Sequence, residues 1–241
     1  MRLADVAAAA GVSTSAASFV LNGRTDQRIP EETKVRVQEA AARLGYRPNA
    51  TARTLRTGTS GTYAFVSDFI SSTSVANAMV RGALRELDAQ GALMFAVETQ
   101  GDADMERRLV EQLLDRHVDG MIYASMFTRR TVPPALTPGV PLVLLNCLPE
   151  PGAAGVDLAA VLPDEVGAGR AAAEALLRAG HRDRIAFLGT FPEGMSGGEQ
   201  WGGLHPLALD LRLQGIGERL AKEGLALAEA VPVTGWDVAD G

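Results

Sequence analysis

Three hydroxyl side chains, Ser13, Thr14 and Ser15, follow a glycine turn near the start of the chain. Apolar residues recur at helical spacing over residues 3–10, Gly11 can adopt the positive φ that ends a helix, and Ser13 can cap a second helix. This spacing predicts a helix-turn-helix, which lays the start of its second helix in the major groove of DNA. Hydroxyl groups there can reach base edges or phosphates, although Thr14 and Ser15 can also serve only as helix-start residues.

Other chemistries find little support in the residue types. There is no nucleophile–histidine–acid set and no nucleotide fingerprint, and His117, His181 and His205 lack the spacing of metal ligands. We therefore expect no catalytic residue, no metal site and no cofactor. The single cysteine, Cys147, excludes an internal disulfide, and its apolar neighbours predict a buried structural thiol.

The charges of the 241-residue chain are unevenly distributed. Residues 1–60 hold nine Lys/Arg and five Asp/Glu, a net charge of +4, whereas the remainder holds 14 against 24, a net charge of −10. A basic head on an acidic body is typical of a DNA reader fused to a regulatory domain. Because no signal peptide is recognised and no apolar run reaches the ~18 residues of a membrane span, we expect a soluble cytoplasmic protein without a membrane partner.

The elements divide the chain into three predicted parts. Residues 1–46 form an all-α helix-turn-helix head, whose third helix begins at Pro30 and stops at Gly45. Residues 47–61 form a linker with a short hinge helix, too short to be stable without a partner. Residues 62–241 alternate short apolar strands with amphipathic helices, which predicts a doubly wound parallel sheet with ligands at the carboxyl ends of its strands. A glycine-rich stretch at 191–206 is expected to be a surface loop or a lid.

The order of these pieces resembles the LacI/GalR family of bacterial transcription regulators. The pattern DVAxxAGVSxxxxSxVLNG is present at 5–23, and the pattern ExTxxRVxxAAxxLGYRPN at 31–49, with Lys34 where arginine is commoner. The hinge pattern NxxARxLRTGxTGT is present at 49–62, with Ser60 in place of threonine. VDGMIYAS, GHRDRIAFLG and RLQGIGERLAKEGL are similar to the family's sensor domain, so the resemblance implies a periplasmic-binding-protein-like fold.

The resemblance implies a set of DNA-binding residues. In the head, Thr14 and Ser15 match base-reading positions, and phosphate-binding positions are matched by Ser13, Ser18 and Asn22. Phe19 stands where many relatives carry arginine; it can contact a thymine methyl group or pack inside the head. In the hinge, Leu55 matches an apolar wedge that enters the minor groove. Its hinge neighbours would allow close helix approach or hold the DNA backbone: Asn49, Ala52, Arg53 and Arg56.

The resemblance also implies an effector site in the sensor domain. Thr73, Ser74 and Val75 stand where relatives carry an effector loop after the first strand, without the usual aromatic residue. Arg212 matches an arginine that hydrogen-bonds the effector in the crevice of the sensor domain. Asp164 is expected near the mouth of the same crevice. A surface salt bridge is the alternative for Arg212.

The implied function is sequence-specific DNA binding by a transcription regulator, expected to be a repressor. It would bind a pseudo-palindromic operator as a homodimer and respond to a small carbohydrate-like effector. A two-lobed sensor should need roughly 100 residues more, so we expect the second lobe to be incomplete. The alternative function is therefore a truncated, effector-insensitive DNA-binding fragment.

Overall fold

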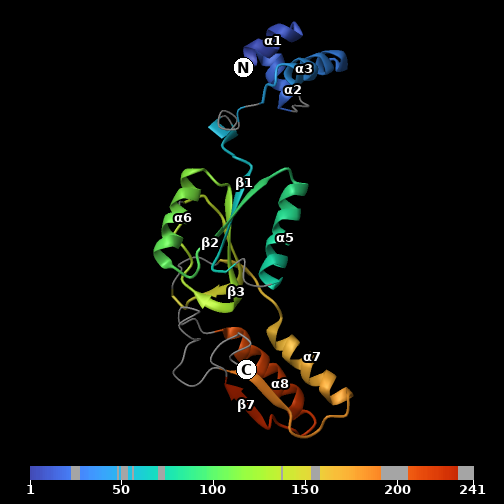
Figure 1. Ribbon diagram of the computed structural model, residues 1–241, viewed down its shortest axis with the longest axis vertical. Helices are drawn as coiled ribbons and strands as arrows, with labels where there is room; N and C mark the ends of the chain where they lie inside the picture. The colour runs from blue at the N-terminus through green and yellow to red at the C-terminus, as the bar shows by residue number, and fades with distance from the viewer. Residues whose placement is uncertain are drawn as a thin grey trace. The chain divides into compact units, whose positions relative to one another are not determined.

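The computed structural model in Figure 1 describes residues 1–22, 28–47, 49, 54–55, 57–69, 74–136, 138–152, 158–190 and 206–232, without the side chains of residues 74, 75 and 190. The chain divides into two compact units, Met1–Ser60 and Gly61–Gly241. Each unit has its own hydrophobic core, and we describe them separately.

The first unit contains three helices: α1 (Leu3–Ala10), α2 (Thr14–Leu21) and α3 (Glu31–Arg43). Gly11 ends α1 at φ 65° and ψ 38°, the left-handed conformation that glycine adopts without steric cost. Ser13 then caps α2, because its side chain accepts a hydrogen bond from the backbone N–H of Ala16 at 3.1 Å. The axes of α1 and α2 are bent by 102°, within the range of a helix-turn-helix.

Small side chains hold the three helices together, and the core of this unit comprises Val6, Ala7, Ala10, Ala17, Val37, Ala40 and Ala41. Val35 and Val37 both belong to the apolar residues of α3, but Val35 is 44% exposed whereas Val37 is fully buried. Positions two residues apart are about 200° apart around a helix axis, so the two side chains cannot face the same core.

The second unit is built on a parallel sheet with the strand order β2-β1-β3-β4-β5. Each strand pairs with its neighbour in parallel register. β1 is buried along most of its length because it is central and covered on both faces. The strands are β1 (Thr62–Ser67), β2 (Leu93–Glu98), β3 (Gly120–Thr131), β4 (Leu142–Pro149) and β5 (Ala159–Val161).

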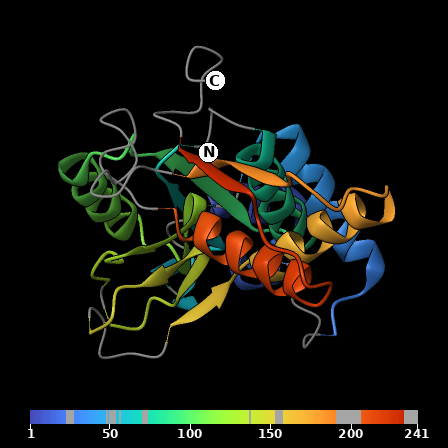
Figure 2. The same cartoon turned by 90° about the horizontal axis from the view of Figure 1, so that it is seen from below.

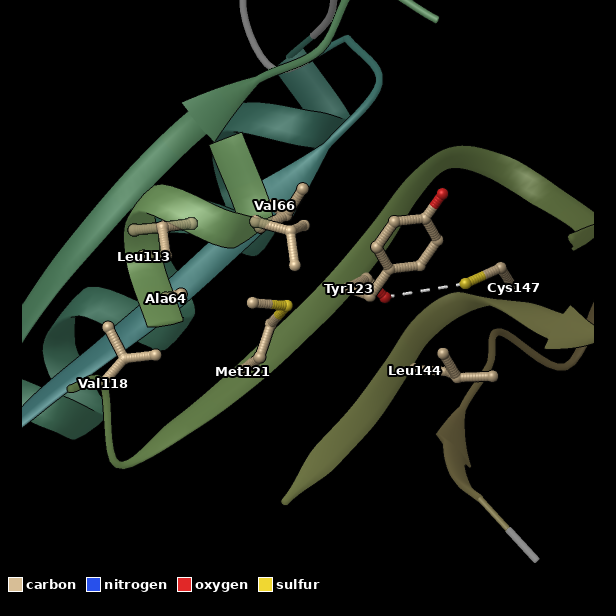
Figure 3. Packing of buried hydrophobic residues seen from close by; sticks show 9 residues of the cluster. Ala64, Val66, Leu113, Val118, Met121, Tyr123, Leu144 and Cys147 are labelled. Carbon is tan, nitrogen blue, oxygen red and sulfur yellow. Dashed lines mark hydrogen bonds between the residues drawn. The ribbon is translucent and has the colours of Figure 1, made fainter. Parts of the chain in front are cut away.

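Helices α5 (Ser74–Ala89) and α6 (Ala103–Asp115) cover opposite faces of this sheet, as Figure 1 shows. On the α5 face, Phe65 and Met94 of the sheet contact Ala83 and Leu87 of the helix. On the α6 face, the core comprises Ala64, Val66, Val110, Leu113, Val118, Met121, Tyr123, Leu144 and Cys147, most of which are drawn in Figure 3. The two clusters fix the sheet and therefore the positions of its strand ends.

Two further helices pack directly on each other, α7 (Glu165–Arg178) and α8 (Leu207–Ala221), and Figure 2 shows them side by side. A short parallel sheet of β6 (Ala186–Thr190) and β7 (Glu229–Pro232) accompanies them. Glycines allow the close approach of the helices: a Cβ on Gly169 would lie 2.2 Å from the Arg212 carbonyl oxygen, and one on Gly215 would lie 2.0 Å from that of Val166.

The predicted order of a helical head followed by a parallel α/β sheet is confirmed. The sequence MVRGALRELDAQG predicts a helix from Met79, and GMIYAS predicts a strand that ends at Ser125. In the structure α5 begins earlier, at Ser74, β3 continues to Thr131, and the short strand β5 is an additional element. Within the described ranges, no single helix is both long and apolar enough to cross a membrane, and α1 with α2 passes that test only as a strongly bent pair.

The glycine contact between α7 and α8 gives a matched pair of substitutions. Gly215→Ala should destabilise the second unit by about 1–3 kcal/mol, because the added Cβ meets backbone that cannot move without separating the helices. Gly217→Ala, on the same helix with open space around it, should stabilise by about 0.5–1 kcal/mol through helix propensity. Urea unfolding measures both values, and equal effects of the two substitutions would contradict the contact.

Candidate functional site

The exposed start of α2 is the first candidate site. Ser13, Thr14 and Ser15 are all exposed at the N-terminus of this helix, in the first unit. The Ser13 hydroxyl already accepts the capping hydrogen bond from Ala16, which fixes its orientation. Thr14 and Ser15 begin the helix itself and present short polar groups beside backbone N–H groups that lack intrahelical partners. This surface suits contact with an anionic backbone or with base edges.

The later turns of α2 hold the other predicted contacts. The Asn22 amide nitrogen donates to the Ser18 carbonyl oxygen at 2.7 Å and lies 3.2 Å from the Ser18 hydroxyl, so these two half-buried side chains hold each other. Phe19 is half-buried and is not among the residues of the head core. Its two predicted roles, contact with a thymine methyl group or internal packing, both stay open.

The predicted hinge is described only in part. Asn49 is exposed, and Leu55, in a short helical segment, has 85% of its surface exposed. An apolar side chain so exposed makes little contact with this chain, which suits a wedge for another molecule. Ala52, Arg53 and Arg56 lie outside the described residues.

A buried polar cluster occupies the carboxyl ends of β1, β3 and β4 and forms the second candidate site. We call it the strand-end cluster; it comprises Asp68, Ser125, Thr128, Arg129, Asn146 and Glu165, all less than 9% exposed. Its centre is Asp68, which directly follows β1. One Asp68 carboxylate oxygen accepts from the backbone N–H groups of Phe69 and Met126 at 2.8 and 2.9 Å. The other lies 3.3 Å from the Ser125 hydroxyl and 3.4 Å from Arg129 Nη2.

The cluster continues from β3 to β4 and α7. The Asn146 amide nitrogen donates to the Ser125 carbonyl oxygen at 3.0 Å. Thr128 Oγ1 lies 2.7 Å from Asn146 Oδ1 and 3.0 Å from Glu165 Oε1. Asn146 has φ 59°, a left-handed conformation that asparagine tolerates better than most residues. The cluster therefore joins residues that are up to 61 positions apart in the chain.

The structure places the predicted effector residues in different settings. Arg212 donates to Glu165 Oε2 at 2.6 Å and forms a salt bridge with this buried carboxylate, while 44% of the Arg212 side chain stays exposed, so its contact with an effector stays a prediction. Asp164 is exposed and caps α7 through a 2.8 Å hydrogen bond from the Gly167 N–H. Ser74 and Val75 open α5, and Thr73 lies outside the described residues.

Further buried polar and titratable groups lie on the α6 side of the sheet. Arg129 Nε is buried and has no hydrogen-bond partner among the described residues. The Tyr123 hydroxyl donates to Glu106 at 2.8 Å, and burial raises the pKa of both side chains. Burial also raises the pKa of the Cys147 thiol to about 12, and this thiol donates to the Tyr123 carbonyl oxygen, the dashed line in Figure 3. Within the described ranges, no group of three or more His, Cys, Asp or Glu side chains could hold a metal ion.

Sequence reasoning missed all six members of the strand-end cluster. A signal was nevertheless present: Ser67 and Asp68 directly follow the apolar run YAFV, and SMFTRRT directly follows the apolar run MIYA. Polar residues at the carboxyl ends of parallel strands meet at one edge of the sheet. Asn146 within the apolar run LVLLNC was a further signal. Glu165 was hidden because its neighbour Asp164 has the better capping position.

Two models of known protein families match this chain. Residues 2–49 match the family model of bacterial regulatory proteins of the lacI family. Residues 70–198, more than half of the chain, match the model of periplasmic binding proteins and the sugar binding domain of the LacI family. The chain belongs to the LacI family.

LacI-family relatives extend beyond the length of this chain. The maltose regulon regulatory protein MalI of Escherichia coli is 32% identical over 204 residues, covering 83% of this chain and 56% of that protein. The transcriptional regulator CelR of Thermobifida fusca is 32% identical over 233 residues, covering 94% and 63%. The chain thus spans about three fifths of the length of these relatives. Both relatives carry names of regulators and not of enzymes.

A solved LacI-family structure has the same fold. The lac repressor dimer bound to operator and an anti-inducer aligns with 96% of this chain and 65% of its own, with a TM-score of 0.69 and 19% identity. At this identity the likeness concerns the fold alone. Both candidate sites therefore lie on a LacI-family scaffold, and their roles in this chain are matters of proposal.

Cys147 should be inert in the folded protein. Because the thiol is fully buried and its pKa is about 12, a thiol reagent at pH 7 should label it only after unfolding in urea. In the unfolded chain the thiol ionises near pH 9, so the free energy of unfolding should fall as the pH rises from about 9 toward 12.

The control for this pH dependence is Cys147→Ala, which should show a flatter decline between pH 9 and 10 than the wild type. Tyr123, whose pKa is also raised, contributes in both proteins only above about pH 10. Rapid labelling of the native protein at pH 7 would contradict the burial of the thiol.

Proposed function

We propose that the protein is a sequence-specific DNA-binding transcription regulator, acting as a repressor that a small carbohydrate-like effector controls. In this proposal residues 1–46 read DNA, residues 47–61 form the hinge, and residues 62–241 sense the effector. The protein binds a pseudo-palindromic operator as a homodimer. The observation that carries the proposal is the exposed start of α2 on a helix-turn-helix head that matches the LacI family.

The chemistry of the head supports the DNA-binding part. Thr14 and Ser15 are exposed at the start of a helix whose N-terminal residues would lie nearest the base edges. Leu55 is exposed on the hinge, where two copies from a dimer would part a base step and bend the duplex. The net charge of +4 over residues 1–60 favours the approach to phosphate. The lac repressor was solved as a dimer bound to operator, which motivates the same assembly here.

The strand-end cluster supports the effector part. It places buried donors and acceptors at the carboxyl ends of parallel strands, the usual ligand position in such sheets. Arg212 is half exposed beside it and can present its free guanidinium nitrogens to a hydroxyl group. One relative is named the ribose operon repressor, which favours a sugar as the effector class.

Operator binding can be tested by selecting the binding site from random DNA. Selection from a random duplex pool should enrich a pseudo-palindrome, and its affinity should fall steeply with salt. Leu55→Ala should weaken binding to the enriched duplex on the order of tenfold and leave binding to a scrambled duplex nearly unchanged, because only the specific complex uses the wedge.

Leu84→Ala is the matched control, since Leu84 is an exposed leucine on α5 outside the head. It should leave both affinities unchanged. Equal losses of specific and non-specific affinity in Leu55→Ala, or the enrichment of no sequence, would overturn the DNA-binding part of the proposal.

Effector control requires a second measurement. A panel of neutral sugars should contain at least one that changes the affinity for the enriched duplex, and Arg212→Ala should weaken that response on the order of tenfold through the loss of charge-assisted hydrogen bonds. Arg170→Ala, which removes an exposed arginine paired with Glu218, is the control and should respond as the wild type does. Specific DNA binding without a response to any sugar would reject the carbohydrate class and leave the DNA-binding part intact.

A further inference from the structure

A hydrogen bond across the second unit joins the five-stranded sheet to the α7–α8 pair. Thr128 belongs to β3 and Glu165 to the first turn of α7, and the two side chains are 1% and 4% exposed. Thr128 also contacts Asn146 of β4, at 2.7 Å. We call the contact between Thr128 Oγ1 and Glu165 Oε1 the latch. Glu165 is at the same time the ion-pair partner of Arg212 on α8.

The number of protons at Thr128 is too small for both of its contacts. A threonine hydroxyl has one proton to donate. Asn146 presents its oxygen to Thr128, because its nitrogen donates to the Ser125 carbonyl oxygen on the other side. Glu165, as the carboxylate partner of Arg212, can only accept. Two acceptors therefore compete for a single hydroxyl proton.

We propose that the Thr128 hydroxyl is a two-position switch between the sheet and the α7–α8 pair. When its proton points to Glu165, the latch is closed and α7 is held against β3. When the proton points to Asn146, Thr128 donates to Asn146 Oδ1 within the sheet. The latch is then open, because Thr128 Oγ1 and Glu165 Oε1 face each other without a proton between them. The proposal goes beyond the proposed function and stands without it, since it concerns only the attachment of α7 and α8 to the sheet.

The switch predicts an unusual response to the removal of a charge. In Glu165→Gln, the amide nitrogen can donate to Thr128 Oγ1 while the amide oxygen still accepts from Arg212. Thr128 is then free to donate to Asn146, and both contacts are made together. A latch that depends only on the ion pair predicts the opposite result, because the substitution removes the negative charge. Whether Glu165→Gln strengthens or weakens the attachment of α7 to the sheet therefore distinguishes the switch from a latch that depends only on the ion pair.

The rate of backbone amide hydrogen exchange in the full chain, without DNA or effector, tests how firmly the latch holds α7 and α8. We follow the backbone amides of residues 168–172 of α7 and 211–216 of α8, with those of 107–113 in α6 as the internal reference. Thr128→Val, which keeps the side-chain shape and removes the hydroxyl, should speed exchange in α7 and α8 about tenfold, the loss of one hydrogen bond to a charged group. Thr128→Ser should stay within about twofold of the wild type. Glu165→Gln should slow exchange about threefold.

The double variant Thr128→Val with Glu165→Gln should lose the protection that Glu165→Gln alone provides, because the glutamine has no hydroxyl to bind. Glu174→Gln is the control for charge removal on α7. It loses the ion pairs with Arg178 and Arg219 and should leave the amide exchange rates in the first turn of α7 unchanged. Faster exchange in Glu165→Gln, or no difference among the variants, overturns the proposal. If Thr128→Val fails to fold, Glu165→Gln alone decides, because the two explanations predict opposite signs.

Discussion

The buried carboxylate of Asp68 is the constraint on which the strand ends of the second unit depend. A charge removed from water is costly unless hydrogen bonds surround it, and here two backbone N–H groups, two hydroxyls and a guanidinium do so. Three of these donors, the Ser125 hydroxyl, the Met126 N–H and the Arg129 guanidinium, come from β3, beyond the part that pairs regularly with β1. The carboxylate therefore dictates the course of β3 after it leaves the sheet centre.

The pairing of β3 with β4 is irregular at the same place, between Ala124 and Arg129. Ala124 pairs with Leu145 and Arg129 pairs with Cys147, so β3 advances five residues where β4 advances two. The extra residues bring the Met126 N–H to Asp68 and leave Thr128 facing Asn146. Asn146, at φ 59°, is the residue of β4 that accommodates the irregularity. One buried charge thus accounts for the bulge, and the bulge places Thr128 within reach of α7.

The sequence predicted the features that depend on neighbouring residues and missed those that depend on distant ones. The turn at Gly11, the cap at Ser13 and the alternation of strands and helices are local patterns, and the structure has them. The contact of Asp68 with Arg129 joins residues 61 positions apart, and that of Thr128 with Glu165 joins residues 37 apart. No periodicity encodes such pairs. Arg212 was recognised by its motif alone, and its partner Glu165 was found only in the structure.

The attachment of α7 and α8 to the sheet is softer than the attachment of these helices to each other. Between the helices, Gly169 and Gly215 bring backbone against backbone, a contact that cannot slide without a steric clash. The surface ion pairs between them, such as Arg170 with Glu218, are exposed and add little. Toward the sheet, by contrast, the latch relies on a single hydroxyl proton that two acceptors share. The proposed switch at Thr128 would therefore act on the helix pair as a whole, and Glu165 connects it to Arg212, whose side chain is 44% exposed. A ligand that drew Arg212 away from Glu165 would change what the carboxylate can offer Thr128, because one residue contacts both side chains.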